Sequence, residues 1–157
     1  MPALDGSLFG KGQPCFGCGP DHPHGLRLSF TEVGDEVHTR YLPRTSQQGP
    51  PNIMHGGLVF TLADELAAWG VIVKLGKFGF TARFQGKLQK PVRPGTELHG
   101  RSKIVRSTGR TAEVHVLLTQ EGEPAFDGTF TFAIVDRGAA EKMIGGPIPA
   151  EWDRYLR

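Results

Sequence analysis

The chain has 157 residues and a mass of 17.1 kDa, which suits a single domain able to bury a core without disulfide or metal support. Hydrophobic residues make up 38% and charged residues 22%, a balance that excludes a disordered chain. The 18 basic and 16 acidic side chains leave a net charge of only +2. A total charge this small argues against a protein that binds nucleic acid through a large excess of positive charge.

The longest apolar stretch covers residues 58–73, and Asp64 and Glu65 lie at its centre. A lone membrane span does not normally tolerate such a pair, so we expect no membrane partner. The first residues lack the apolar run of a signal peptide. We therefore expect a cytoplasmic protein, in which Cys15 and Cys18 remain thiols.

The first two dozen residues are rich in Gly, Pro and His and are predicted to form a loop. Apolar residues alternate with polar ones over 26–30, which predicts a half-buried strand. Gly34-Asp35 predicts a turn into a second strand over about 37–42. Residues 44–54 contain Gly-Pro-Pro and are predicted to be irregular.

Residues 57–75 carry the one long helical pattern, flanked by Gly56 and Gly76. The pattern is apolar almost all round, which predicts a helix in the core. Next, apolar residues at 78, 80, 82 and 84 alternate with residues 79, 81, 83 and 85, as in a strand. Further strand patterns cover 98–105, 112–118 and 126–134, with turns at 107–109 and 122 and a break at 91–95. The tail from 138 is rich in Gly and Pro, with a short helix predicted near Glu151.

This order of elements predicts the α+β class, in which an antiparallel sheet with one apolar face wraps and buries a long helix. Asp64 and Glu65 are the only charges in the apolar part of that helix. Adjacent residues lie about 100° apart around a helix, so the two carboxylates cannot face one site. Either one could face water or pair with a basic residue of the sheet. We favour a functional role for Asp64 and this structural role for Glu65.

The segment His55-Gly56-Gly57 precedes the apolar helix. The first N–H groups of a helix have no partner within it, and glycines allow a ligand to approach them closely. Such a terminus binds anions and can stabilise an oxyanion in a transition state. Plain flexibility at a loop–helix junction is the alternative, and the presence of Asp64 makes the functional interpretation the better one.

His55-Gly56-Gly57 followed by Leu-Ala-Asp ending at Asp64 resembles the helix motif of hotdog-fold acyl-CoA thioesterases, especially the phenylacetyl-CoA thioesterase-like branch. The resemblance implies that Asp64, nine residues after His55, is the catalytic carboxylate. It implies that Gly57 or its immediate neighbour donates the N–H that polarises the thioester carbonyl. Thr81 matches a position where the family often places a Ser or Thr that orients the nucleophilic water.

Two segments depart from the family pattern. Some members have an Asn six residues before the His, whereas this chain has Gly49 there and Asn52 as the nearest Asn. The N-terminal segment is longer than in the simplest members and resembles a variant branch that starts with Cys-Phe-x-Cys-Gly. The order of elements over about 26–135 fits the family, so we expect one domain over 1–157 with that core and an N-terminal loop over 1–25.

Eight Lys and Arg residues lie between Thr81 and Arg110, opposed only by Glu97, which gives a local charge of +7. A solvated sheet face is one interpretation, and an anionic partner is the other. The stretch has no nucleic-acid motif and no interleaved aromatic residues, so we favour the phosphates of coenzyme A. The resemblance also places nucleotide contacts at the turn between Arg106 and Arg110, where amides and guanidinium groups suit phosphate. The candidate substrate-binding residues are Asn52, Gly56, Glu65, Arg83, Arg106, Gly109 and Arg110.

Cys15 and Cys18, with His22 and His24 nearby, offer the ligands of a zinc site of two Cys and two His. A redox pair is a second interpretation, and two small thiols packing the loop is a third. We favour packing and therefore expect no metal. The remaining histidines are interpreted as structural: His38, His99 and His115.

The function that these features predict is hydrolysis of an acyl-CoA thioester, which is the substrate, without a further cofactor. Asp64 acts either as general base toward water or as a nucleophile that forms a mixed anhydride. The alternative from another class is a non-catalytic acyl-CoA binding or sensor protein on the same fold. A hotdog dehydratase fits less well, because those enzymes use a His base and His55 precedes the helix.

Gly57 and Asp64 are seven residues apart, which is about 10 Å along a helix. A base or nucleophile acts within about 3 to 3.5 Å of the reacting carbon, so one helix is too long to hold both ends of the site. An antiparallel helix from a second chain would bring Asp64 of one copy to Gly57 of the other. We therefore expect a homodimer, or a dimer of dimers, with two sites per dimer.

Overall fold

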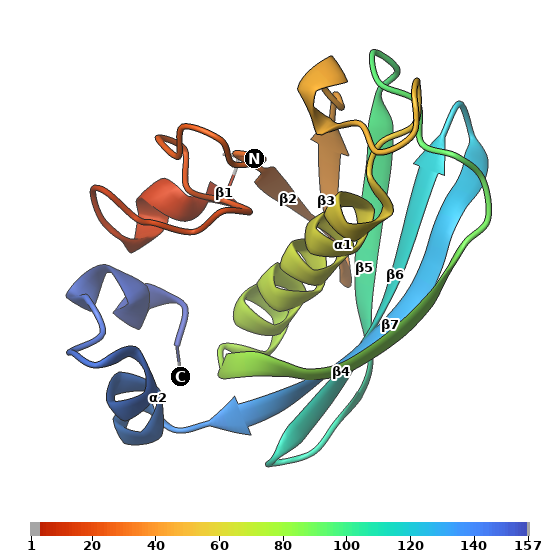
Figure 1. Cartoon of the computed structure of the whole chain (residues 1–157). Helices are drawn as coiled ribbons and strands as arrows, with labels where there is room; N and C mark the ends of the chain where they lie inside the picture. The colour runs from red at the N-terminus through yellow and green to blue at the C-terminus, as the bar shows by residue number, and fades with distance from the viewer. Residues whose placement is uncertain (1–3, 157) are drawn as a thin grey trace.

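A seven-stranded antiparallel sheet curves around one long helix in the computed structural model, which describes residues 4–156 (Figure 1). Neighbouring strands follow the order β1-β2-β3-β5-β6-β7-β4. The strands are β1 (Leu4–Asp5), β2 (Ser29–Val33), β3 (Glu36–Tyr41), β4 (Phe78–Leu88), β5 (Leu98–Ser107), β6 (Thr111–Gln120) and β7 (Glu123–Val135). The predicted α+β arrangement of a sheet wrapped around a helix is confirmed.

The central helix α1 (Gly56–Gly70) runs across the concave face of the sheet and continues as one π-helical turn, η3 (Val71–Leu75). Its side chains at Leu62, Leu66 and Trp69 are fully buried against the sheet. Close approach depends on Gly100 of β5, because a Cβ there would lie 2.7 Å from a methyl carbon of Leu66. No helix within residues 4–156 is long and apolar enough to cross a membrane.

Strand β4 contains a bulge that decides which side chains face the helix. Its register with β7 shifts between Thr81 and Arg83. Before the bulge, Gly79 packs toward Val71, and the hydroxyl of Thr81 donates a hydrogen bond to Asp64 of α1. After the bulge, the ring of Phe84 packs against the rings of Phe60 and Phe130. Strict alternation would have placed residues 81 and 84 on opposite faces of the strand. The bulge brings both to the helix side.

The N-terminal segment differs from its prediction. The strand expected over 26–30 begins only at Ser29, and Leu26 and Leu28 instead donate their N–H groups to the carbonyls of Phe16 and Gly17. These two leucines are still buried, since the loop folds over the core. A short β1 and the 3-10 turn η1 (Gly6–Phe9) also form in the segment predicted to be loop.

The C-terminal segment forms α2 (Arg137–Ile144), which the Gly/Pro content of the tail concealed, and the predicted short helix, η4 (Ala150–Arg154). Asp136 caps α2 by accepting the N–H of Ala139 at 2.8 Å, a start signal present in the sequence. Trp152 of η4 packs on Phe9, with 3.9 Å between ring centroids. The turns η1 and η4, from the N- and C-terminal segments, therefore pack together, and Phe9 of η1 also contacts Trp69 of α1.

Candidate active site

The carboxyl group of Asp64 lies midway along α1 and turns toward β4. Thr81 Oγ1 donates a hydrogen bond of 2.6 Å to Asp64 Oδ1. Burial raises the pKa of Asp64 above its ordinary value, and the Thr81 hydrogen bond opposes that rise. Asp64 is only partly buried and Thr81 is exposed along the strand, so the pair lies within reach of solvent. The structure thus brings together two residues that the sequence singled out.

The start of α1 is closed by His55. Its ring Nδ1 accepts the N–H of Gly57 at 3.0 Å, which caps the helix and places the ring proton of the neutral imidazole on Nε2. A Cβ at position 57 would lie 3.1 Å from that nitrogen. The Gly57 N–H is therefore already engaged, contrary to the expectation of an open donor. The N–H of Gly56, the first residue of α1, cannot reach a carbonyl within the helix.

Comparison with known proteins shows which proteins this arrangement resembles. Residues 51–125 match the family model of the thioesterase superfamily. A hypothetical thioesterase from Streptococcus pneumoniae, solved with coenzyme A, is 23% identical with a TM-score of 0.64, over 69% of this chain and 85% of that one. The chain has the hotdog fold.

Two further solved structures share this hotdog fold. A thioesterase from Haemophilus influenzae is 16% identical with a TM-score of 0.65, over 71% of this chain and 80% of that one. A Streptococcus mutans protein bound to acetyl-CoA is 20% identical with a TM-score of 0.64, over 69% of this chain and 88% of that one. A search of curated proteins gives no significant match. The phenylacetyl-CoA thioesterase-like branch stays a prediction.

The loop before the hotdog helix shows which position lies against its start. A Cβ on Gly49 would lie 3.3 Å from the Cα of His55, so the position at which some family members have an Asn touches the helix cap. Asn52 lies farther along, on an exposed turn with φ 62°, where its carbonyl accepts Arg93 at 3.1 Å. None of its hydrogen bonds within residues 4–156 joins Gly57 or Asp64, so the structure does not bring Asn52 into the Asp64 site.

A small apolar hollow of about 240 Å³ lies beside the start of α1. It is lined by Ile53, Met54, Gly56, Val59 and Leu88, among others. A Cβ on Gly56 would lie 3.2 Å from a methyl carbon of Leu88, so the glycine keeps this side of the helix accessible. Of the predicted binding residues, Gly56 is thus placed at a cavity.

Glu65 turns the other way, toward the N-terminal loop. Cys15 Sγ donates to Glu65 Oε1 at 3.3 Å, and Cys18 lies beside them. Burial raises the pKa of Glu65 to about 8. Glu65, one of the predicted substrate-binding residues, thus faces the N-terminal loop and not the Asp64 site. The basic residue of the sheet that was expected to pair with it is not its partner, because two thiols lie beside it. Sequence spacing separated the two carboxylates but gave no signal for the fifty-residue contact with Cys15.

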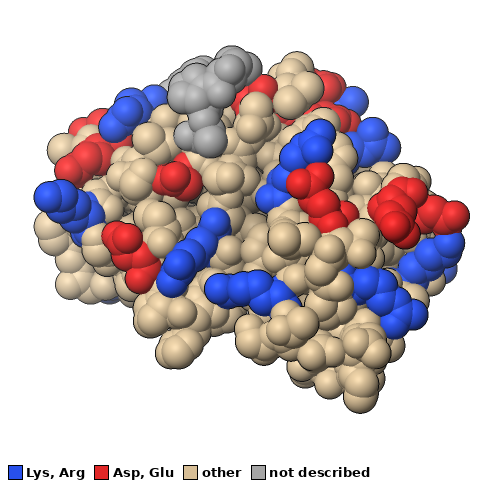
Figure 2. All heavy atoms as spheres, turned by 90° about the horizontal axis from the view of Figure 1, so that it is seen from above, with Lys and Arg blue, Asp and Glu red and all other residues tan. Residues whose placement is uncertain are grey.

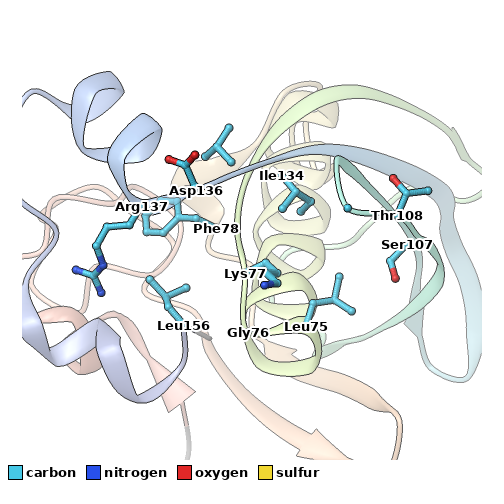
Figure 3. A pocket seen from close by; sticks show the side chains of 12 residues that line it. Leu75, Gly76, Lys77, Phe78, Ser107, Thr108, Ile134, Asp136, Arg137 and Leu156 are labelled. Carbon is cyan, nitrogen blue, oxygen red and sulfur yellow. The ribbon is translucent and has the colours of Figure 1, made fainter.

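A larger hollow of about 610 Å³ lies at the far end of α1, between η3, the start of β4, the β5–β6 turn and the start of α2 (Figure 3). Lys77, Phe78, Thr108, Gly109 and Arg137 are among its lining residues. Gly109, a predicted substrate-binding residue, is therefore at a cavity. That cavity lies near the opposite end of the helix from Gly57.

Several backbone N–H groups of the β5–β6 turn are already hydrogen-bonded within the turn, which the sequence did not indicate. Thr108 Oγ1 accepts the N–H groups of Arg110 and Thr111 at 3.2 and 3.0 Å, and the Thr108 N–H donates to the Thr111 carbonyl. These amides are thus unavailable to a phosphate, contrary to expectation. Arg106 and Arg110 remain exposed on either side of the turn, so their guanidinium groups are the phosphate donors that this turn offers.

The local charge of +7 is partly compensated by the fold. Lys103 pairs with Asp35 at 2.9 Å and Lys90 pairs with Glu123, both brought from outside the basic stretch. Figure 2 shows both signs of charge scattered over the face seen from above. Arg83 is exposed on β4 beyond the bulge. The remaining histidines form side-chain contacts: His38 with Glu36 and His99, and His115 with Asp127.

The hydrogen bond between Thr81 and Asp64 can be tested without any substrate. Thr81→Ala removes the interaction that opposes the burial effect, so the pKa of Asp64 should rise further above its value in the unchanged protein. Thr81→Ser keeps the hydroxyl, so the pKa of Asp64 in that variant should lie close to its value in the unchanged protein. Carboxyl chemical shifts followed against pH measure this value. An Asp64 pKa that is the same in the Ala and Ser variants would show that the hydroxyl does not act on the carboxyl.

Proposed function

We propose that the protein hydrolyses an acyl-CoA thioester to a free acid and coenzyme A. The observation that carries this proposal is Asp64, a partly buried carboxyl on an apolar helix, held by the hydroxyl of Thr81. The thioesterase family match supports it, as do two proteins of the same fold solved with coenzyme A and acetyl-CoA.

In this proposal the start of α1 holds the carbonyl oxygen of the thioester. The Gly56 N–H is the nearest donor, and the Gly57 N–H joins it when the His55 ring turns away. Asp64 then either takes a proton from an attacking water or attacks the carbonyl carbon itself. In the second case an acyl–Asp64 anhydride remains after the thiolate leaves, and water hydrolyses it to the free acid. Collapse of the tetrahedral adduct breaks the carbon–sulfur bond and releases the thiolate of coenzyme A, which takes up a proton.

Thr81 acts as a positioning residue for Asp64. Its hydrogen bond fixes one carboxylate oxygen and leaves the other for water or for the substrate carbon. The raised pKa of Asp64 makes its ionised form a stronger base than a solvated carboxylate. Arg106 and Arg110 would bind the phosphates of the nucleotide through their guanidinium groups.

The proposed site is completed by a second copy of the chain. Strand β4 pairs with β7 along one edge, and its other edge has no strand partner within residues 4–156. Phe84 and Leu88 on this strand are 53% and 50% exposed. A long apolar edge is normally covered, and a two-fold dimer formed through β4 would cover this edge on both chains. It would also supply the antiparallel helix that the 10 Å span between Gly57 and Asp64 requires.

A non-catalytic acyl-CoA binding protein is the second candidate, and one observation favours it. The His55 ring occupies the Gly57 N–H that an oxyanion would need. A binding protein would take up acyl-CoA without releasing free thiol. Detection of thiol from a panel of acyl-CoA thioesters separates the two functions, and binding without release would favour the second.

Asp64→Asn should abolish thiol release while leaving the fold intact. The amide keeps the size of the side chain and its hydrogen bond to Thr81 but cannot act as base or nucleophile, so we expect turnover to fall by at least about 100-fold. Glu65→Gln, the neighbouring change on the same helix, should lower turnover much less, because Glu65 faces the N-terminal loop. Wild-type turnover in folded Asp64→Asn protein would remove Asp64 from the mechanism.

Charge reversal at Arg106 or Arg110 should raise KM for acyl-CoA more than it lowers kcat. The same variants should act almost normally on a short thioester that lacks the nucleotide, since only the phosphate contact is lost. Arg101→Glu provides a control, because Arg101 is equally exposed on β5 but lies away from the turn. Equal effects on both substrates would exclude a role for these residues in nucleotide binding.

Mixing two inactive variants should restore activity if the site spans two chains. One variant is Asp64→Asn and the other is Gly57→Val, whose Cβ would press on the His55 ring. After subunit exchange, each heterodimer keeps one site with wild-type residues on both sides, so it should regain about half the activity of a wild-type dimer. Exchange is verified by labelling the two variants differently. If exchange occurs without activity, both halves of the site lie in one chain.

A further inference from the structure

A cluster of three metal-ligating side chains lies outside the proposed active site. Cys15 and Cys18 of the N-terminal loop meet Glu65 of α1, and their ligand atoms all lie within 4.8 Å of one another. The sulfur of Cys15 is 3.3 Å from Glu65 Oε1. Cys18 is fully buried, Glu65 is largely buried and Cys15 is half-buried. The thioesterase proposal uses none of the three.

The backbone holds the two thiols in place against the helix. The Cys18 N–H points at the Cys15 sulfur at 3.4 Å, an interaction that favours a thiolate, and the Gly19 N–H closes the turn on the Cys15 carbonyl at 2.9 Å. Glycine at position 17 allows this close approach, because a Cβ there would lie 2.6 Å from the Glu65 carboxyl group. The loop is thus seated directly on Glu65, through contacts that no local motif predicts.

We propose that Cys15, Cys18 and Glu65 bind a zinc ion. Two cysteines separated by two residues are the common half of a zinc site, and a carboxylate oxygen is a regular zinc ligand. Zinc bonds of about 2.3 Å to sulfur and 2.0 Å to oxygen place tetrahedral ligand atoms about 3.5 to 3.8 Å apart. The separation of 3.3 Å between Cys15 and Glu65 needs only a small adjustment. The half-buried side of Cys15 leaves the fourth position to water or a small anion.

Charge favours a cation at this cluster. Within residues 4–156, Glu65 forms no ion pair with Lys, Arg or His, and its polar side-chain contacts are the two cysteines. A buried carboxyl group of this kind is normally neutral, paired or bound to a metal. A zinc ion balances most of the charge of two thiolates and one carboxylate.

A disulfide between the same cysteines fits the surroundings less well. Its formation would remove the S–H group of Cys15 that now donates to Glu65. The carboxyl group would then be buried beside two sulfurs that have no hydrogen to donate. Zinc instead bonds all three groups at once, so we favour the metal over the redox pair.

The four-ligand arrangement suggested by the sequence is not formed. His22 packs edge-on against Phe16, with 5.3 Å between ring centroids, and its Nδ1 accepts the His24 N–H. Neither histidine belongs to the cluster found among the described residues. Glu65, fifty residues from Cys15, takes their place. His22 and His24 therefore provide matched controls for the metal site.

Direct metal binding tests the proposal without an activity measurement. Reduced, chelator-treated full-length protein is titrated with zinc against a coloured chelator. We expect one zinc per chain, and we expect cobalt to give tetrahedral spectra with a thiolate charge-transfer band. Cys15→Ser, Cys18→Ser and Glu65→Gln should each weaken zinc binding at least about tenfold. His22→Ala combined with His24→Ala should bind zinc as the unchanged protein does.

X-ray absorption of the unchanged zinc-loaded protein keeps the test decisive where a cysteine variant fails to fold. Two sulfur neighbours with oxygen filling the remaining positions would support the site, whereas a shell of nitrogen and oxygen alone would overturn it. Folded, reduced protein that retains no zinc would also overturn it. A loss of two hydrogen masses under oxidised glutathione, without zinc binding by the reduced form, would assign the cysteines to a disulfide instead.

Discussion

The architecture depends on how two adjacent carboxylates are accommodated on an apolar helix that a sheet surrounds. Burial of an unpaired carboxylate is costly, and the 100° step between neighbouring residues sends the two groups in different directions. Asp64 turns to β4, where Thr81 donates a hydrogen bond, and Glu65 turns to the N-terminal loop, where Cys15 donates one. Each carboxylate thus requires a hydrogen-bond donor from a neighbouring segment, which packs beside α1.

The two surroundings differ in the access that they allow. The Asp64 side lies along an exposed strand, so a substrate or a partner chain can reach the carboxyl group. The Glu65 side is covered by the N-terminal loop, which approaches the carboxyl group closely at Gly17. One helix therefore carries an open carboxyl suited to chemistry and a covered one suited to ligating a cation. Because the two residues are neighbours in the chain, an ion bound at Glu65 would anchor the helix next to Asp64.

Strand β4 links this helix to the state of assembly. Its bulge directs Thr81 toward Asp64, while its free edge exposes the apolar side chains of Phe84 and Leu88. The isolated chain thus presents a positioned carboxyl on one side of an uncovered edge, and the capped helix start lies several ångströms away along α1. In the proposed dimer, a partner chain at this edge would cover the apolar side chains and bring a second helix start close to Asp64.

The sequence by itself determined the α+β class, the long core helix, most strands and the separation of Asp64 from Glu65, because these follow from local periodicity and apolar patterning. It also singled out Asp64, Thr81 and His55. Only the tertiary structure decided that His55 caps Gly57, that Thr108 occupies the turn amides and that Glu65 meets Cys15. It alone revealed the bulge that turns Thr81 inward. The contact of Glu65 with Cys15 joins residues fifty positions apart, the bulge depends on one extra residue in a strand register, and the bonds made by His55 and Thr108 depend on side-chain orientation; none of these leaves a periodic signal in the sequence.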